Sequence, residues 1–435
     1  MNHSGNARGF FFLNVTQFCG AANDNILKQV LIFGLAAGGI WADKLGAGAQ
    51  AYGSLCLAIP FVLFSGFAGQ FSDRFSKRNV SIGVKLSEVL IAGLAMYGLL
   101  LENLWLVLAS LLLISLQSTF FTPAKFGILP EILPAKKLSR ANGTINMFTY
   151  IAVILGGAVG GPLYDAYAPD SSMHPNSLPM LWLPGMVLLV IGAVGTAASF
   201  GLPRVGAKNP TLKIRPLLFR TYWETWHEIA GKPVASVIVA WSYFYFIVGG
   251  FAILILPDYK ELLEITATQT AGLMALLGVS IGIGDYVAGR VSGHEIKPGL
   301  IPIGAIGTTI TFFVLGVIPL EYFSVLACLT ASGFMAGFFM VPLQTMIQYL
   351  TDQEQRGRVL GLWSCASFVG IIIGNIVFLM VKQTGIASNR VFLICGLLGL
   401  MGVFLYYFHW RSIFAGALGK MQSDAGVEPT ELSAE

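Results

Sequence analysis

The side chains of this sequence best suited to chemistry lie inside an apolar stretch, residues 10–40. They are carboxamides, one carboxylate and one ammonium: Gln17, Asn23, Asp24, Asn25 and Lys28. A stretch of this length can cross a bilayer, where no water solvates an ion or an amide. Polar groups at such a depth face a bundle interior or a wet cavity, and an ionisable one indicates a functional site. We therefore expect these five side chains to bind a polar ligand.

Asp24 and Lys28 are one helical turn apart, so their side chains share a helix face. One interpretation is an ion pair that only helps two helices pack. The other is a ligand-facing polar stripe, which we favour because ionisable residues inside membranes are rare and mostly functional.

Two more polar side chains are candidates for substrate binding. Lys125, near the end of a later apolar stretch, could bind a phosphate as a point charge. It could equally extend its ammonium to the lipid head-groups. Gln344 is a candidate in the second half of the chain, which is otherwise nearly uncharged within its apolar stretches.

The composition indicates the elements that must hold these residues. The chain of 435 residues is 55% hydrophobic and 11% charged, whereas soluble domains are about 25% charged. We therefore predict an all-α membrane protein. The five cysteines all fall in apolar stretches, which indicates buried thiols without disulfides, and the five histidines have no metal-ligand spacing. We expect no metal and no cofactor.

Hydropathy predicts twelve transmembrane helices, six on each side of a polar break. They lie near residues 10–40, 50–72, 79–101, 104–128, 142–165 and 180–202, and then near 233–257, 268–290, 299–319, 322–350, 359–382 and 391–410. The predicted domains are an N-terminal bundle (1–202), a cytoplasmic linker (203–232), a C-terminal bundle (233–410) and a cytoplasmic tail (411–435).

The basic residues predict the orientation. Most lysines and arginines fall in loops on the N-terminal side, whereas the other side holds Lys44, Lys260, Lys382 and Arg390. Cytoplasmic loops carry this excess, so both termini are expected in the cytoplasm. The net charge of +4 thus reflects topology, and nucleic acid is not an expected partner.

The two halves repeat weakly at an offset of 218 residues. Arg140 aligns with Arg358, Gly143 with Gly361, and Gly156 with Gly374. Six-helix halves that repeat are typical of secondary transporters, whose substrate site lies between the halves near the middle of the membrane. We expect pseudo-two-fold symmetry between the bundles.

A short motif follows the second predicted helix. The sequence GQFSDRFSKR contains Gly69, Asp73, Arg74, Lys77 and Arg78. A loop selected only for positive charge would explain the three basic residues, but not the glycine and the aspartate. Gly69 lets two helices touch, and Asp73 can pair with a cation or with a helix N-terminus. Such a contact is a conformational latch if it forms in one state and breaks in the other.

This motif resembles the loop between helices 2 and 3 of the major facilitator superfamily. Two other stretches, TQFCGAANDNILKQ and FFTPAKFGILPEILPAKKLSRANG, resemble its lysophospholipid transporter branch and the transporter domains of bacterial transporter–acyltransferase fusions. The resemblance implies a flippase of the bacterial inner membrane that works by alternating access. It would move lysophospholipid, chiefly lysophosphatidylethanolamine, from the outer to the inner leaflet for re-acylation.

The resemblance also implies roles for particular residues. In that branch an acidic residue of the first motif and the lysine of PAK handle the head-group, and they fall here on Asp24 and Lys125. The expected partners are lysophospholipid, membrane lipids and a separate acyltransferase, and by analogy the protein is expected to be a monomer. One departure stands out: the branch has an arginine in helix 7, whereas residues 233–257 carry no basic side chain.

The same residues bear on two other functions. A proton-coupled exporter of amphipathic molecules would use Asp24 as its proton carrier, although a neighbouring Lys28 would favour the anion and so disfavour that role. A membrane enzyme would need a nucleophile and a base, and the local sequences at His174 and His294 resemble no catalytic motif. We therefore expect a transporter that is not an enzyme.

Overall fold

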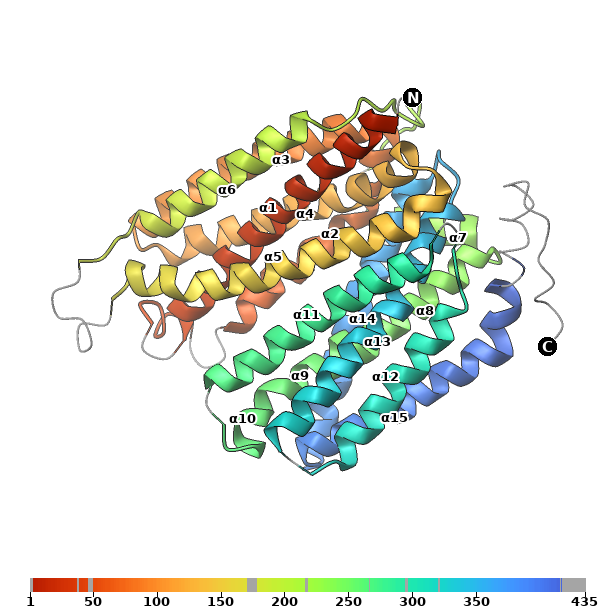
Figure 1. Ribbon diagram of the computed structural model, residues 1–435. Helices are drawn as coiled ribbons and strands as arrows, with labels where there is room; N and C mark the ends of the chain where they lie inside the picture. The colour runs from red at the N-terminus through yellow and green to blue at the C-terminus, as the bar shows by residue number, and fades with distance from the viewer. Residues whose placement is uncertain are drawn as a thin grey trace. The chain divides into compact units, whose positions relative to one another are not determined.

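The computed structural model describes residues 3–36, 39–45, 50–169, 178–215, 218–265, 267–293, 296–319, 321–414 and 416. Figure 1 shows their helices in chain order. The long helices of the first half are α1 (His3–Leu35), α2 (Gln50–Arg74), α3 (Lys77–Leu100), α4 (Leu104–Ile132), α5 (Leu138–Tyr167) and α6 (Leu183–Phe200). Those of the second half are α8 (Pro233–Ile247), α11 (Ala267–Val291), α12 (Leu300–Val317), α13 (Tyr322–Tyr349), α14 (Arg356–Gln383) and α15 (Ser388–Leu405).

Shorter helical segments complete the described chain. They are η1 (Ala135–Lys137), α7 (Leu218–Ile229), η2 (Val248–Ala252), α9 (Ile253–Ile255), η3 (Leu256–Asp258), α10 (Tyr259–Leu262) and η4 (Tyr406–Trp410). The segments from α8 to α9 form one continuous membrane-spanning stretch, Pro233–Ile255.

The helices are long and apolar enough for a bilayer. Among the described residues, eleven helical stretches qualify as membrane spans by length and composition. Helix α1 has 33 residues, more than the roughly 20 that a span requires, and its central polar side chains make it less apolar than the others. With α1 included, the twelve predicted spans each correspond to a helix.

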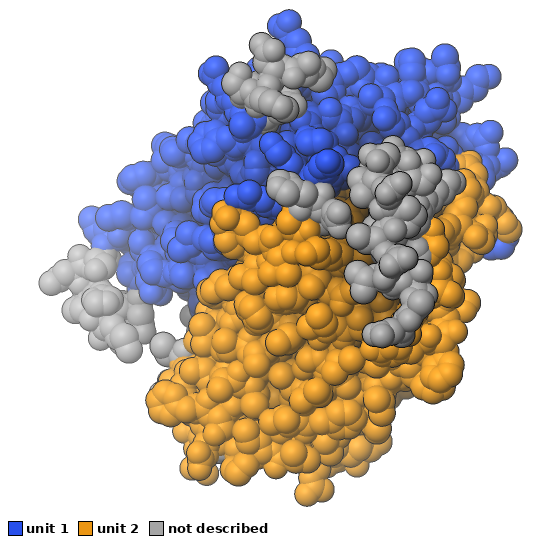
Figure 2. All heavy atoms as spheres, turned by 45° about the vertical axis from the view of Figure 1, so that its right-hand side comes forward, with its two compact units in different colours: residues 1–225, 352–368 blue, residues 226–351, 369–435 orange. Residues whose placement is uncertain are grey.

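The chain divides into two compact units, coloured separately in Figure 2. Unit 1 comprises residues 1–225 and 352–368, and unit 2 comprises residues 226–351 and 369–435. The first turns of α14 thus belong to unit 1, because their backbone binds a side chain of α2. The domain limits drawn from the sequence stay a prediction, and residues 415 and 417–435 of the predicted tail lie outside the described residues.

Within unit 1, α1 packs on α5 and α6, and α4 packs on both α2 and α3 (Figure 1). The apolar core of the unit gathers around Trp41, Leu99 and Tyr167, all 1% exposed or less. The polar tips of its aromatic residues are satisfied, since the Tyr167 hydroxyl donates to the Leu99 carbonyl at 2.9 Å. Asn103 caps α4 by accepting hydrogen bonds from the backbone N–H groups of Trp105 and Leu106. These contacts fix one end of α3 and α4.

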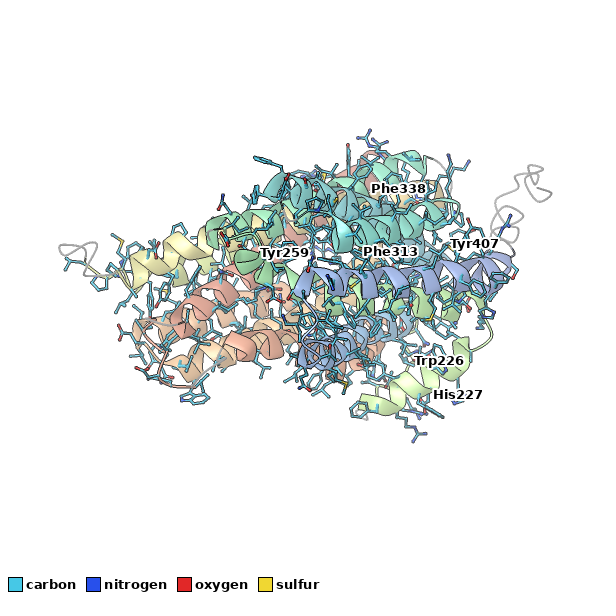
Figure 3. All side chains as sticks on the ribbon, turned by 90° about the horizontal axis from the view of Figure 1, so that it is seen from below. Trp226, His227, Tyr259, Phe313, Phe338 and Tyr407 are labelled. Atoms are coloured by element: carbon cyan, nitrogen blue, oxygen red, sulfur yellow. The ribbon has the colours of Figure 1, made fainter. Side chains whose placement is uncertain are left out.

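Within unit 2, α13 packs on α11 and α12, and α12 packs on α15. The π-helical turn η2 lies where α8 passes α14: a Cβ on Gly250 would be 2.5 Å from the Cα of Gly374. Only a small residue allows two backbones to approach this closely. Figure 3 labels Tyr259 of α10 and Phe313 of α12, whose rings pack against α15 at Phe392 and Gly396.

Helix α7 lies in the polar break and is strongly amphipathic. Its aromatic side chains Phe219 and Trp223 are 67% and 66% exposed, and Figure 3 labels Trp226 on the same helix. Arg220 donates to the Glu224 carboxylate at 2.7 Å, and this hydrogen bond lowers the pKa of that carboxyl. Exposed aromatic rings beside basic residues are typical of a helix at a membrane surface.

Candidate functional site

A buried network of polar side chains joins α1, α3 and α4 in unit 1. Its members, called the polar cluster below, are Asn23, Asp24, Lys85, Glu88, Gln117 and Ser118. The centre is the Glu88 carboxylate, which receives hydrogen bonds from Asn23 at 2.8 Å and from Gln117 at 2.8 Å, and an ion pair from Lys85 at 2.5 Å. All three donors and the carboxylate are almost wholly buried. Burying a charge pair costs desolvation free energy, and the hydrogen bonds and ion pair that satisfy the Glu88 carboxylate offset this cost.

The sequence of α1 makes room for this network. Gly20 lies one turn before Asn23 and Asp24, and a Cβ there would be 2.5 Å from the Lys85 ammonium nitrogen. The lysine can therefore reach Glu88 only because position 20 has no side chain. Lys85 and Glu88 are three residues apart on α3, so they share the face that α1 covers.

Asp24 forms a different contact from the one that helical spacing favours. Ser118 of α4 donates to Asp24 Oδ2 at 2.7 Å. In the part of the chain that the structure describes, no ion pair joins Asp24 to Lys28, although the two charges lie close enough to interact electrostatically. Asp24 Oδ1 is buried and accepts no hydrogen bond from any described residue. The interpretation as a simple ion pair is therefore not what the structure shows.

Lys125 lies on the same face of α4 as Ser118 and Phe121. It is 7% exposed, so its ammonium does not extend to the surface of unit 1. The ammonium nitrogen lies 4.2 Å from the centre of the Phe126 ring and 6.0 Å from that of Phe121. The Lys85 nitrogen lies 5.2 Å from the same Phe121 ring. Aromatic faces of this kind attract cations, so the two rings stabilise the Lys125 ammonium in its buried position.

The other substrate-binding candidates are placed less centrally. Gln17 donates to the Thr149 hydroxyl at 3.1 Å and so links α1 to α5. Asn25 donates to the Ala21 carbonyl of its own helix at 2.8 Å. Gln344 is 1% exposed on α13 and belongs to unit 2, outside the polar cluster.

Sequence reasoning missed two members of the polar cluster. Gln117 and Ser118 precede Lys125 by eight and seven residues, so all three follow one face of a helix. This spacing was a usable signal in an otherwise apolar α4. A third omission is Asp285 of α11, which is wholly buried in unit 2. His174 and His294 lie outside the described residues.

The aromatic residues of α8 serve as packing groups. The Tyr243 hydroxyl donates to the Leu398 carbonyl at 2.6 Å, and the Trp241 and Tyr245 rings stack at 5.3 Å. Near the other end of unit 2, Asp258 accepts from Lys382 at 2.6 Å. These contacts pair the Tyr243 hydroxyl, the Lys382 ammonium and the Asp258 carboxylate within the unit.

Two of the predicted latch residues, Gly69 and Asp73, contact the N-terminus of α14. Asp73 is fully buried, and its two carboxylate oxygens accept from the backbone N–H groups of Gly357 at 2.6 Å and Arg358 at 3.0 Å. A carboxylate favours this position because a helix N-terminus carries partial positive charge and unpaired donors. A Cβ on Gly69 would be 2.4 Å from the Gly357 carbonyl oxygen, so α2 and α14 can meet only at a glycine.

The three basic residues of the motif have distinct partners. Lys77 pairs with the buried Glu131 carboxylate at 2.7 Å. Arg78 donates to the Leu202 carbonyl at 2.9 Å. The Arg74 guanidinium lies 5.5 Å from the centre of the Phe75 ring. Lys77 and Arg78 thus hold α3 to its neighbours, a role beyond positive charge alone.

Comparison with known proteins places this geometry in context. The family model of the Major Facilitator Superfamily matches residues 13–375. The lysophospholipid transporter LplT of Escherichia fergusonii is 26% identical over 334 residues, covering 72% of this chain and 78% of that protein. The LplT of Cronobacter sakazakii is 27% identical over 349 residues, covering 79% of this chain and 80% of that protein.

Solved structures show the same fold at lower identity. The crystal structure of the human organic anion transporter MFSD10 is similar with a TM-score of 0.72 and 15% identity, over 92% of this chain and 99% of that one. The transporter FucP in its outward conformation is similar with a TM-score of 0.70 and 14% identity, over 92% of this chain and 98% of that one.

Proposed function

Because the chain belongs to the major facilitator superfamily, we propose that it is a secondary transporter that carries lysophospholipid across the inner membrane by alternating access. The predicted major facilitator fold is confirmed. The substrate assignment is supported by similarity to proteins named lysophospholipid transporters over more than two thirds of both chains. Lysophosphatidylethanolamine is the proposed substrate, because it carries both an ammonium and a phosphate.

The observation that carries the proposal is the arrangement of Asp24. Its Oδ2 is held by Ser118, while its buried Oδ1 accepts no hydrogen bond from the described residues. A buried carboxylate oxygen needs a donor, and the ammonium of an ethanolamine head-group supplies one together with the opposite charge. Lys125, which interacts electrostatically with Asp24, is the proposed partner of the phosphate. Gln17, Asn25 and Lys28 would contact the substrate from the same α1.

We assign the conformational latch to the contact between Asp73 and the N-terminus of α14. Its two charge-assisted hydrogen bonds would form in one state of the transport cycle and break in the other. Arg74, Lys77 and Arg78 would support it by fixing the start of α3. Breaking a buried carboxylate–amide contact is costly, so the latch would bias the protein toward the state that contains it.

The direction of transport and the orientation are further parts of the proposal. Basic residues concentrate in the loops on the N-terminal side, which supports cytoplasmic termini. With that orientation, the substrate would move from the outer to the inner leaflet. A separate acyltransferase would then attach a second acyl chain to the lysophospholipid.

The test is transport of labelled lysophosphatidylethanolamine into the inner leaflet of proteoliposomes. Asp24→Asn keeps the size of the side chain and removes its charge. We expect its initial rate to fall at least about tenfold, the effect of losing about 1.4 kcal/mol of binding. Asp165→Asn makes the same change at an exposed position of α5 and should transport like the parent protein. Equal rates for Asp24→Asn and Asp165→Asn would contradict the assignment.

One observation keeps proton-coupled export of amphipathic molecules as the second candidate. Asp24 is not held in an ion pair with Lys28 in the described structure, so the argument from Lys28 against a proton carrier is weaker than the sequence suggests. The same proteoliposomes separate the candidates when an imposed proton gradient is added. Lysolipid movement that is independent of the gradient supports the flippase, whereas strict dependence supports the exporter.

A further inference from the structure

A groove lies between α2, α3 and α4 of unit 1. It encloses about 680 Å³, which falls within the range of about 300–1,000 Å³ typical of ligand pockets. Helix α4 forms its floor with Leu116 and Phe120, and α2 and α3 form its walls with Phe71 and Val84. All of its lining residues belong to unit 1.

The surroundings of the groove define what can occupy it. All three helices are long and apolar enough to span a membrane, so a groove open to their lipid-facing side would meet hydrocarbon. The lining of α3 runs from residue 76 to residue 91, about 22 Å at 1.5 Å per residue. This exceeds the roughly 15 Å of one leaflet, half of a core of about 30 Å. An elongated apolar group, such as an acyl chain, matches this shape.

The middle of the groove is open. No atom lies within 4 Å of the position that a Cβ on Gly83 would take, and Leu90 on the same helix is 76% exposed. Substitution of Gly83 would therefore fill the groove without a clash. Gly93, also on α3, has the same free space and does not line the groove.

One end of the groove is polar and cationic. Phe75, Ser76 and Asn79 line this end, next to the loop between α2 and α3. The Arg74 guanidinium lies 5.5 Å from the centre of the Phe75 ring, and among the described residues no carboxylate pairs with it. A cation at the end of an apolar groove complements the phosphate of a lipid whose chain lies in the groove.

The groove also borders the polar cluster. Gln117 lines it, and the same side chain donates to Glu88 Oε2 at 2.8 Å. We propose that the groove binds one acyl chain of a bilayer phospholipid, whose phosphate is held by Arg74. The second chain remains in the bilayer, because the groove has room along α3 for one. This lipid is a resident component distinct from the transported substrate, and in contact with Gln117 it would support the polar cluster.

The experiment measures the lipid that stays bound when the full chain is purified in mild detergent. Native mass spectrometry counts bound phospholipid, and added 1-palmitoyl-2-oleoyl-phosphatidylglycerol gives the affinity. Gly83→Phe should lower the bound fraction at least fivefold, whereas the matched control Gly93→Phe should bind like the parent protein. Arg74→Gln should weaken binding about fivefold, the size expected of one cation–phosphate contact at a membrane surface.

Two outcomes would overturn the proposal. Equal retention of phospholipid by the Gly83→Phe, Gly93→Phe and parent proteins would show that lipid binds elsewhere. Recovery of single-chain lysophospholipid in place of diacyl lipid would assign the groove to the substrate. Arg74→Gln serves as an independent test if Gly83→Phe fails to fold. Because the readout is binding, it does not depend on whether the protein transports lysolipid.

Discussion

The Asp73 carboxylate accepts a 2.6 Å hydrogen bond from the backbone N–H of Gly357, a residue 284 positions later in the chain. The aspartate lies in the last turn of α2, and the glycine lies in the first turn of α14. Three features contribute to this contact: the Asp73 carboxylate, the partial positive charge at the N-terminus of α14, and the close approach of the two helices at Gly69. This contact is the one that we propose as the latch.

Asp73→Asn should weaken this contact. The amide has one acceptor oxygen in place of two, so one of the two N–H groups loses its partner. Hydrogen bonds to charged groups contribute about 1.5–3 kcal/mol. Amide hydrogen exchange in the segment 352–368 should therefore become about ten- to a hundredfold faster.

The control is Asp352→Asn, at an exposed position just before α14. It should leave the exchange rates in that segment unchanged. If Asp73→Asn preserves the protection of Gly357 and Arg358, the capping contact does not stabilise this state.

Ser118→Ala should impair transport through Asp24. The substitution removes the donor that holds Oδ2, so the carboxylate loses its fixed orientation. We expect the initial rate of lysolipid transport to fall about tenfold, since about 1.4 kcal/mol corresponds to a factor of ten.

Ser110→Ala is the matched control for that variant. Ser110 lies on the same α4 and is buried, but its hydroxyl donates only to the Leu106 carbonyl of its own helix. It should transport at close to the parent rate. A similar loss in both variants would mean that the effect arises from α4 packing.

The helices could be predicted from the sequence because their physical cause is local. Apolar length alone defines the spans, and only α1 required a decision about polar residues in its middle. Trp223 and Trp226 in the polar break are a comparable local signal for the amphipathic α7. The break of α8 at Gly250 was not, because it depends on the approach of Gly374 from a distant helix.

The partners within the site were harder to predict. Helical spacing makes Lys28 a neighbour of Asp24, which left an ion pair open as one interpretation, whereas the hydrogen-bond donor to Asp24 is Ser118 on another helix. A single sequence shows which side chains share a face of one helix, but it does not show which other helix packs against that face. The three-residue spacing of Lys85 and Glu88 puts both side chains on one face of α3. The hydrogen bonds of Glu88 to Asn23 and Gln117 again depend on tertiary packing.

Glu88→Gln should strongly destabilise unit 1. It leaves the buried Lys85 ammonium without a counter-charge, and breaking a buried pair in this way costs about 3–5 kcal/mol. The midpoint of thermal unfolding in detergent should fall clearly.

The double variant Lys85→Met with Glu88→Gln removes both charges and keeps an acceptor for Asn23 and Gln117. It should recover part of the lost stability. If the double variant is less stable than Glu88→Gln alone, the charge pair is not what the single substitution breaks.

The central claim is that Asp24 recognises the ammonium of the head-group, and a comparison of two substrates tests it most directly. Transport of lysophosphatidylethanolamine and lysophosphatidylglycerol, which lacks the ammonium, is measured for the parent protein and for Asp24→Asn. We predict that the parent protein prefers the ethanolamine lipid and that Asp24→Asn loses this preference. An equal fractional loss for both lipids would contradict the claim, because Asp24 would then act without regard to the ammonium.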